Sequence, residues 1–167
     1  RTTRDTQAAL QAGLTLDGLT NLRLVSLDAD LARQAAKLAA THYLRGADAV
    51  YLGGPSFSLR AKAGNFDADT MREGVRYAHG HGVKVYATVN ILAHNDDLAG
   101  LDQYLRELGA IDVDALIIAD PGILMRARTL VPQLPLHLST QANVTNRLAA
   151  AFWLDQGAAR LNLAREL

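Results

Sequence analysis

The sequence predicts an α/β fold, a parallel (β/α) repeat that forms an incomplete TIM-barrel-like domain of about six units. Short apolar, β-rich runs recur along the chain, and each run ends in polar residues before a helical stretch. Successive runs lie roughly 20 to 35 residues apart, which is the length of one βα unit in a barrel. Strict alternation of strand and helix favours a parallel sheet with right-handed crossovers.

The individual elements follow from these apolar runs and from the helical periodicity between them. We expect strands at Leu22–Ser26, Ala49–Leu52, Lys84–Asn90, Ala115–Ile118, Leu136–Leu138 and Arg160–Leu163. We expect helices at Ala29–Leu44, Ala68–His79, Leu98–Leu108, Gly122–Leu130 and Asn146–Asp155.

Capping residues support the helix boundaries. Asp67 and Asp69 precede or open the second helix, and Asp97 precedes the third. Glycines stand where helices are expected to end, at Gly46, Gly80, Gly82, Gly109 and Gly157.

Two arrangements of this repeat are open at this stage, a closed barrel and an open doubly wound sheet. Six units fall short of the eight of a barrel. A doubly wound sheet that binds nucleotides carries a glycine-rich phosphate loop, yet no G-x-G-x-x-G or Walker loop follows the first strand. The Gly53-Gly54 pair alone is weak evidence for such a loop.

Composition limits the classes of function. The chain has 167 residues, of which 49% are hydrophobic and 20% charged, so one domain over residues 1–167 is expected, with an uncertain segment at 1–21. Seventeen basic residues balance seventeen acidic ones, so no overall field favours nucleic acid or anionic membrane. Without cysteine, these residues supply no disulfide, thiolate nucleophile or thiolate-bound metal. No apolar run is long enough for a membrane helix, and a cytoplasmic location is the simplest expectation.

Polar residues follow nearly every expected strand. The carboxyl ends of parallel strands share one rim, where ligands bind. The residues that reach it here are Arg60, Asn65, Asn90, His94, Asn95, Asp120, Ser139–Asn143, Arg165 and Glu166. Asn and Gln both donate and accept hydrogen bonds, which suits a ligand rich in hydroxyls and carbonyls, whereas arginine suits a carboxylate or phosphate. The sequence therefore predicts a rim that binds a small carboxylic acid.

Six segments at this rim resemble a known family. They read "GADAVYLGG", "FSLRAKAGNF", "VYATVNILAHNDDL", "ALIIADPGILM", "HLSTQANVTN" and "ARLNLAREL". Together, over residues 46 to 167, they resemble peptidase family U32, the collagenase-like peptidases, and most closely its tRNA-hydroxylation branch. The resemblance implies a barrel followed by a cysteine-rich iron–sulfur region, with prephenate-dependent hydroxylation of the tRNA wobble uridine. Related branches hydroxylate ribosomal RNA or ubiquinone precursors.

Two features depart from the family pattern. Residues 1–21 match nothing in it, and Leu24-Val25-Ser26-Leu27-Asp28 stands where the family has Pro-Ala-Gly after its first strand. The chain also stops where the family continues towards its cysteines. We therefore expect a fragment that lacks the cluster and is inactive alone, with an open sheet edge that can pair with a second copy.

Three functions remain open on this basis: RNA hydroxylation with tRNA as partner, peptide hydrolysis, and a non-catalytic half-barrel binding module. Against hydrolysis, the sequence has no H-E-x-x-H motif, no cysteine and no serine in a nucleophile elbow. The non-catalytic binding module predicts a dimer that forms through the open sheet edge.

Each candidate residue has a structural alternative. Asp120 and His94 are candidate catalytic residues, but Asp120 before Pro121 is also a common helix start. His94 suits contact with a ligand and a loop hydrogen bond equally, and a metal site with Asp96 or Asp97 is a further alternative. No metal is expected, because capping is the better reading of those aspartates. The candidate ligand-binding residues are Asn90, Ser139, Gln141, Asn143, Arg165 and Glu166.

The remaining candidates are charged or aromatic. Gln141 and Asn143 are the strongest of the rim set, whereas Arg165 is also suited to a rim ion pair with Glu166 or Asp120. Arg60 and Lys62 lie in a loop long enough to touch RNA phosphates, and solvated surface charge is the alternative. The sequence further predicts His79 and His81 at the surface and Trp153 in the core.

Overall fold

The computed structural model describes residues 24–26, 48–59 and 66–166. They form one six-stranded sheet in which neighbouring strands are parallel and follow the order of the chain. The strands are β1 (Leu24–Ser26), β2 (Ala49–Gly53), β3 (Lys84–Val89), β4 (Ala115–Ile118), β5 (Leu136–Leu138) and β6 (Arg160–Leu161).

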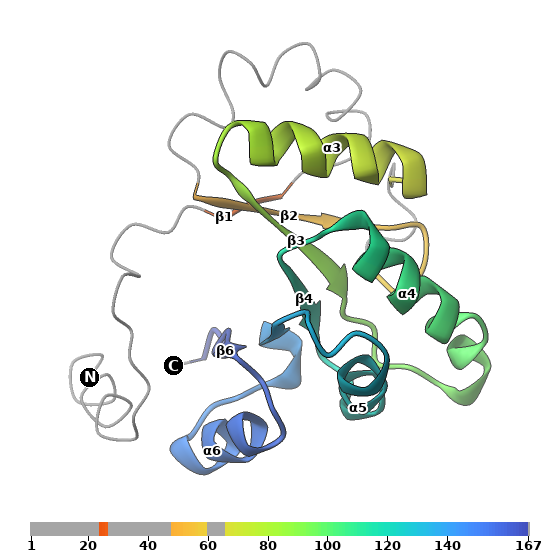
Figure 1. Ribbon diagram of the computed structural model, residues 1–167. Helices are drawn as coiled ribbons and strands as arrows, with labels where there is room; N and C mark the ends of the chain where they lie inside the picture. Colours follow the sequence, from red (N-terminus) through yellow and green to blue (C-terminus); the bar gives the residue numbers. More distant parts are fainter. Residues whose placement is uncertain (1–23, 27–47, 60–65, 167) are drawn as a thin grey trace.

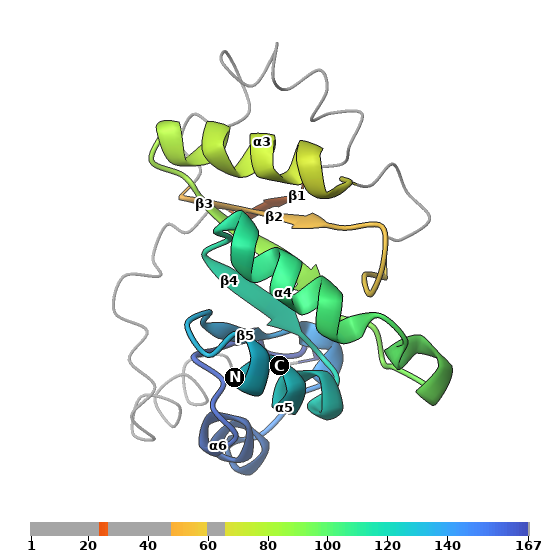
Figure 2. The ribbon, with the colours of Figure 1, turned by 45° about the vertical axis from the view of Figure 1, so that its right-hand side comes forward.

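Helices connect the strands from β2 onward. They are α3 (Ala68–Gly80), α4 (Leu101–Ile111), α5 (Pro121–Leu130) and α6 (Arg147–Asp155), with short 3-10 helices η2 (Asn95–Leu98) and η3 (Thr140–Ala142) after β3 and β5. Figures 1 and 2 show α3 to α6 following one another in an arc along one side of the curved sheet.

This arrangement decides between the two folds that the sequence left open. A doubly wound sheet reverses its strand order and carries helices on both faces. Here the order β1 to β6 is unbroken and the described helices line one face, which is how a TIM barrel winds. The fold is therefore a barrel-like (β/α) repeat.

The two faces of the sheet have different cores. Towards the helices, alternate strand residues such as Val85, Leu116 and Leu136 pack with Leu105 and Ile123 in the larger apolar cluster. The opposite, concave face carries a smaller cluster of Ala49, Tyr86, Ala115 and Ile117. Since side chains alternate along a strand, the residues between the helix-facing ones line this inner face.

Most helix starts obey the capping chemistry seen in the sequence. The Asp67 side chain accepts a hydrogen bond from Thr70 N at the start of α3, and the Asn146 side chain accepts from Leu148 N and Ala149 N at the start of α6. Each such cap contributes about 1 kcal/mol.

Two of the residues predicted to start or end a helix do not do so, and the strand predicted at Arg160–Leu163 ends at Leu161. Asp97 does not cap α4, because its carboxylate accepts from His94 N within η2, and α4 begins only at Leu101 after Gly100. Gly109 lies inside α4, which continues to Ile111 and ends at Asp112 in the left-handed region, φ 70°. A Cβ at Gly109 would lie 2.9 Å from the Val131 side chain, so close packing explains this glycine.

The other expectations have mixed outcomes. Trp153 is partly buried and packs against the core, whereas its neighbour Phe152 is 52% exposed. His79 and His81 are exposed as predicted, and His79 Nε2 lies 2.8 Å from the Asp114 carboxylate. The predicted helix Ala29–Leu44, the segment 1–21 and Gly46 lie outside the described residues.

Gly54, in the loop after β2, provides a test of packing. A Cβ at this position would collide with the hydroxyl of Tyr104, whose ring packs on Phe57. We expect Gly54→Ala to destabilise the fold by about 1–3 kcal/mol, the usual cost of overpacking, and Tyr104→Phe in the same chain to recover part of the loss. Urea unfolding measures both.

Gly80→Ala is the matched control, because a Cβ there meets nothing within 4 Å. An equal loss in Gly80→Ala, or no recovery in the double variant, would contradict the proposed collision.

Candidate functional site

Hydrogen bonds join each loop at the carboxyl end of a strand to the loop or strand end beside it. The loop after β2 meets the end of β3, where Ile91 N donates to Phe57 O (3.3 Å) and Leu59 N donates to Asn90 Oδ1 (3.4 Å). The Asn90 side chain thus holds the neighbouring loop with its carbonyl, which leaves its amide group for another partner.

Asp120 joins the next two loops. Its Oδ1 accepts from Ile123 N (3.0 Å), which caps α5, and Pro121 occupies the first helical position. Its Oδ2 accepts from Ala93 N (3.2 Å) in the loop after β3. Both carboxylate oxygens therefore accept hydrogen bonds from backbone N–H groups. This agrees with the structural alternative for Asp120, in which it starts a helix. A catalytic role for Asp120 stays a prediction.

The end of β5 is held in the same way. Ser139 is buried, its N–H donates to Ile118 O (2.7 Å), and its hydroxyl accepts from Gln141 N (3.4 Å) at the start of η3. The chain then turns through Asn143 at φ 52°, and Ala164 N, beyond β6, donates to Val144 O (3.1 Å). The Gln141 and Asn143 side chains are exposed on this turn.

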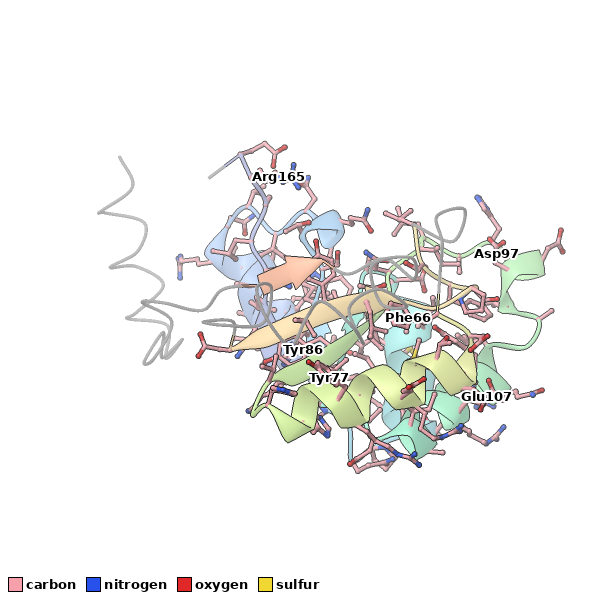
Figure 3. The ribbon with its side chains drawn as sticks, turned by 90° about the horizontal axis from the view of Figure 1, so that it is seen from above. Phe66, Tyr77, Tyr86, Asp97, Glu107 and Arg165 are labelled. Carbon is pink, nitrogen blue, oxygen red and sulfur yellow. The ribbon has the colours of Figure 1, made fainter. Side chains whose placement is uncertain are left out.

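The structure does not bring every predicted rim residue together. His94, Arg165 and Glu166 are exposed, and within the described residues Arg165 pairs with neither Glu166 nor Asp120. Figure 3 places Asp97 and Arg165 at opposite sides of the view. Arg60, Lys62 and Asn65 lie outside the described residues.

The loops nevertheless form one continuous edge from Phe57 to Ala164. Its accessible polar groups include the Asn90 amide, the exposed Gln141 and Asn143 side chains, and His94. These groups can hydrogen-bond hydroxyls and carbonyls. Among the described residues, no group of three or more His, Asp or Glu side chains could hold a metal ion.

The inner face of the sheet holds polar residues that the sequence analysis missed. Thr88 and Ser58 are both buried, with their hydroxyls 3.0 Å apart, and Thr88 Oγ1 donates to Leu52 O (3.1 Å). Nearer the amino ends of the strands, Tyr86 contacts His137 edge to face, with ring centroids 4.7 Å apart. Strand alternation was the signal, since His137 lies between two helix-facing leucines.

His137 is held neutral by its surroundings. Burial, together with the positive charges of Arg160 and Lys84, lowers the pKa of His137 to about 4. The imidazole is therefore uncharged at physiological pH.

A separate pocket of about 250 Å³ lies between α3 and α4, beside the loop after β2. Phe57, Phe66, Met71 and Tyr104 line it, and burial raises the pKa of Tyr104 to about 12, so its phenol stays protonated. This pocket is on the helix side of the sheet, away from the inner face, and shares Phe57 with the rim.

The strand order, the single layer of helices and the polar rim define a protein of the TIM-barrel-like class. A sequence profile described as "Peptidase family U32" matches residues 34–167, and the chain belongs to this family. A solved structure of a U32 peptidase superposes with a TM-score of 0.63 at 16% identity, over 86% of this chain and 58% of that one, which supports the fold alone.

Two relatives are similar over most of this chain. The tRNA hydroxylation protein P1 of Bacillus subtilis is 45% identical over 127 residues, which cover 76% of this chain and 30% of that protein. The 23S rRNA 5-hydroxycytidine C2501 synthase of Escherichia coli is 40% identical over 140 residues, 84% of this chain and 20% of that enzyme. The chain thus spans a third or less of the length of either relative.

Asp120 can be tested as a structural joint. We expect Asp120→Ala to lower the free energy of unfolding by about 1–3 kcal/mol, because it removes a helix cap and a loop hydrogen bond together. Asp120→Asn should lose less, since asparagine still caps α5 while its amide nitrogen cannot accept from Ala93 N. Urea unfolding compares the two variants.

Asp96→Ala is the control, as Asp96 is an exposed carboxylate in the adjacent 3-10 helix. If Asp120→Ala behaves like Asp96→Ala, the two hydrogen bonds of Asp120 contribute nothing to the fold.

His137 makes stability depend on pH. Because its pKa of about 4 lies below the usual 6.5, the unfolded chain binds more protons between these values, so the folded state loses stability as the pH falls through that window. Between pH 7.5 and 5 we expect the wild type to lose about 1–2 kcal/mol more than His137→Gln. Urea unfolding at several pH values measures the difference.

His81→Gln is the control variant, because His81 is an exposed histidine. A His137→Gln variant with the same pH dependence as His81→Gln would show that His137 titrates normally.

Proposed function

We propose that this chain is the barrel part of an RNA-modifying protein that hydroxylates the wobble uridine of tRNA and uses prephenate as the supporting acid. The observation that carries the proposal is the 45% identity to the tRNA hydroxylation protein P1 over 127 residues. The family profile matches residues 34–167, which include the rim described above, where the uncharged amides of Gln141 and Asn143 stand exposed.

The geometry of the rim supports a ligand of this kind. Asn90, Asp120 and Ser139 use their acceptor atoms to hold the loops, whereas the Gln141 and Asn143 side chains point to solvent from the η3 turn. A ligand bound at this edge would therefore meet amide groups that both donate and accept hydrogen bonds, as hydroxyls and carbonyls require. Arg165, exposed beyond β6, would attract a carboxylate.

The iron–sulfur cluster that the family resemblance implies does not fit these residues. Such clusters are bound by cysteine thiolates, and this sequence has no cysteine. The role proposed for this chain is therefore to bind and orient the acid and the RNA.

Peptide hydrolysis has less support from the described residues. The Ser139 hydroxyl is buried and accepts a backbone N–H, and the hydrogen bonds described for it include no histidine. A serine nucleophile needs a base within hydrogen-bond distance, so Ser139 does not fit that role.

A chimera tests the proposal. The aligned segment of the Bacillus subtilis tRNA hydroxylation protein P1 is replaced with this chain in cells that lack the native hydroxylases, and hydroxylated wobble uridine is measured by mass spectrometry of digested tRNA. We expect the modification to return, and Gln141→Ala to reduce it by about tenfold, as the loss of one or two hydrogen bonds to a ligand predicts.

Gln133→Ala is the matched control, because Gln133 is an exposed glutamine just before β5, at the opposite end of that strand. An unmodified tRNA pool with a folded chimera would refute the proposal, and gelatin cleavage by the same purified chimera would favour the peptidase reading instead.

A further inference from the structure

The inner face of the sheet carries a polar cluster at strand positions away from the rim loops. Val85, Ala87 and Leu136 face the helices, so Lys84, Tyr86 and His137 lie on the opposite, concave face. Arg160 pairs in register with His137 on the neighbouring strand β6. In complete TIM barrels this face is filled mostly by bulky apolar side chains, so the polar residues here need a reason.

Tyr86 is the centre of the cluster. The Arg160 guanidinium lies over its ring, 5.6 Å from the centroid, and Arg160 Nη1 donates to the Tyr86 hydroxyl (3.4 Å). The His137 ring packs edge to face against the same ring. These contacts hold the arginine in place and leave its other N–H groups without a protein acceptor in the described part of the chain.

The charges of the cluster are unbalanced. Arg160 and Lys84 are both close enough to His137 to lower its pKa, and His137 itself is neutral. The ion pairs among the described residues are elsewhere, at Arg72–Asp69, His79–Asp114 and Arg126–Asp102. A partly buried guanidinium without a counterion is costly, and an anionic ligand would remove that cost.

We propose that Arg160, Tyr86 and Lys84 form a binding site for a small oxyanion, a carboxylate or a phosphate group, on the concave face of the sheet. Arg160 supplies charge and directional donors, the Tyr86 hydroxyl supplies a further donor, and Lys84 adds positive charge from the start of β3. His137 stays neutral and forms an aromatic wall with Tyr86. Beside them, Ile117 and Ala115 give an apolar surface that suits a carboxylate on an apolar body.

This site is separate from the proposed function. Its residues lie within strands, whereas the rim residues lie in the loops. On the inner face, Thr88 of β3 separates Tyr86 from Asn90, which follows the strand. It can therefore fail or hold independently of RNA hydroxylation.

Titration calorimetry with two probe anions tests the site. Sodium benzoate represents an apolar carboxylate and inorganic phosphate represents a phosphate group, each at constant ionic strength set with chloride. We expect the chain to bind at least one probe, and Arg160→Gln to weaken that binding about tenfold or more, as the loss of a charge-assisted hydrogen bond predicts. Tyr86→Phe, which keeps the ring, should weaken it several-fold.

Arg147→Gln is the matched control, because Arg147 is an exposed arginine at the start of α6. Circular dichroism confirms that each variant is folded. Preference for benzoate assigns the site to carboxylates, and preference for phosphate assigns it to phosphate groups. The proposal is wrong if neither probe binds, or if Arg147→Gln weakens binding as much as Arg160→Gln and Tyr86→Phe do.

Discussion

The sequential, parallel pairing of the strands is the constraint on which the rest of the structure depends. Because each strand pairs with the next one in the chain and all run the same way, every carboxyl end reaches the same edge. Backbone N–H groups then tie consecutive loops together, at Asn90, at Asp120 and at Ser139. Residues separated by about a hundred positions thus belong to one continuous rim.

These loop joints explain the choice of residue at the strand ends. A loop between a strand and a helix leaves N–H groups without partners, and burying them unpaired costs 1–3 kcal/mol each, in order of magnitude. Asp120 resolves this for two loops at once, since one oxygen caps α5 and the other accepts from Ala93 N. At η3, the Ser139 hydroxyl likewise accepts a hydrogen bond from Gln141 N. Polar residues at a rim can therefore be structural, and only those without a protein partner indicate a ligand.

The elements could be predicted from the sequence because their signals are local. The strand β4 is an unbroken apolar run, and α5 begins at an Asp-Pro pair, so both follow from neighbouring residues alone. Asp97 and Gly109 misled the prediction because their roles depend on contacts at a distance or on the shape of one turn. Asp97 closes a 3-10 helix, and Gly109 makes room for Val131. Strand alternation could place Tyr86 and His137 on the inner face, but whether a polar side chain has a partner is a property of the fold, so the unpaired charge of Arg160 could not be predicted from the sequence.

The inner face of β3 shows how satisfied and unsatisfied polar groups differ. Lys84, Tyr86 and Thr88 follow one another along this face, and Asn90 continues it into the rim. Thr88 is buried and fully engaged by Leu52 O and the Ser58 hydroxyl, so its polarity is part of the core. Arg160, by contrast, uses one N–H on Tyr86 and keeps its charge without an acidic neighbour among the described residues. The Thr88 hydroxyl is therefore satisfied within the protein, whereas partial burial of the Arg160 charge has a cost that an anion would offset.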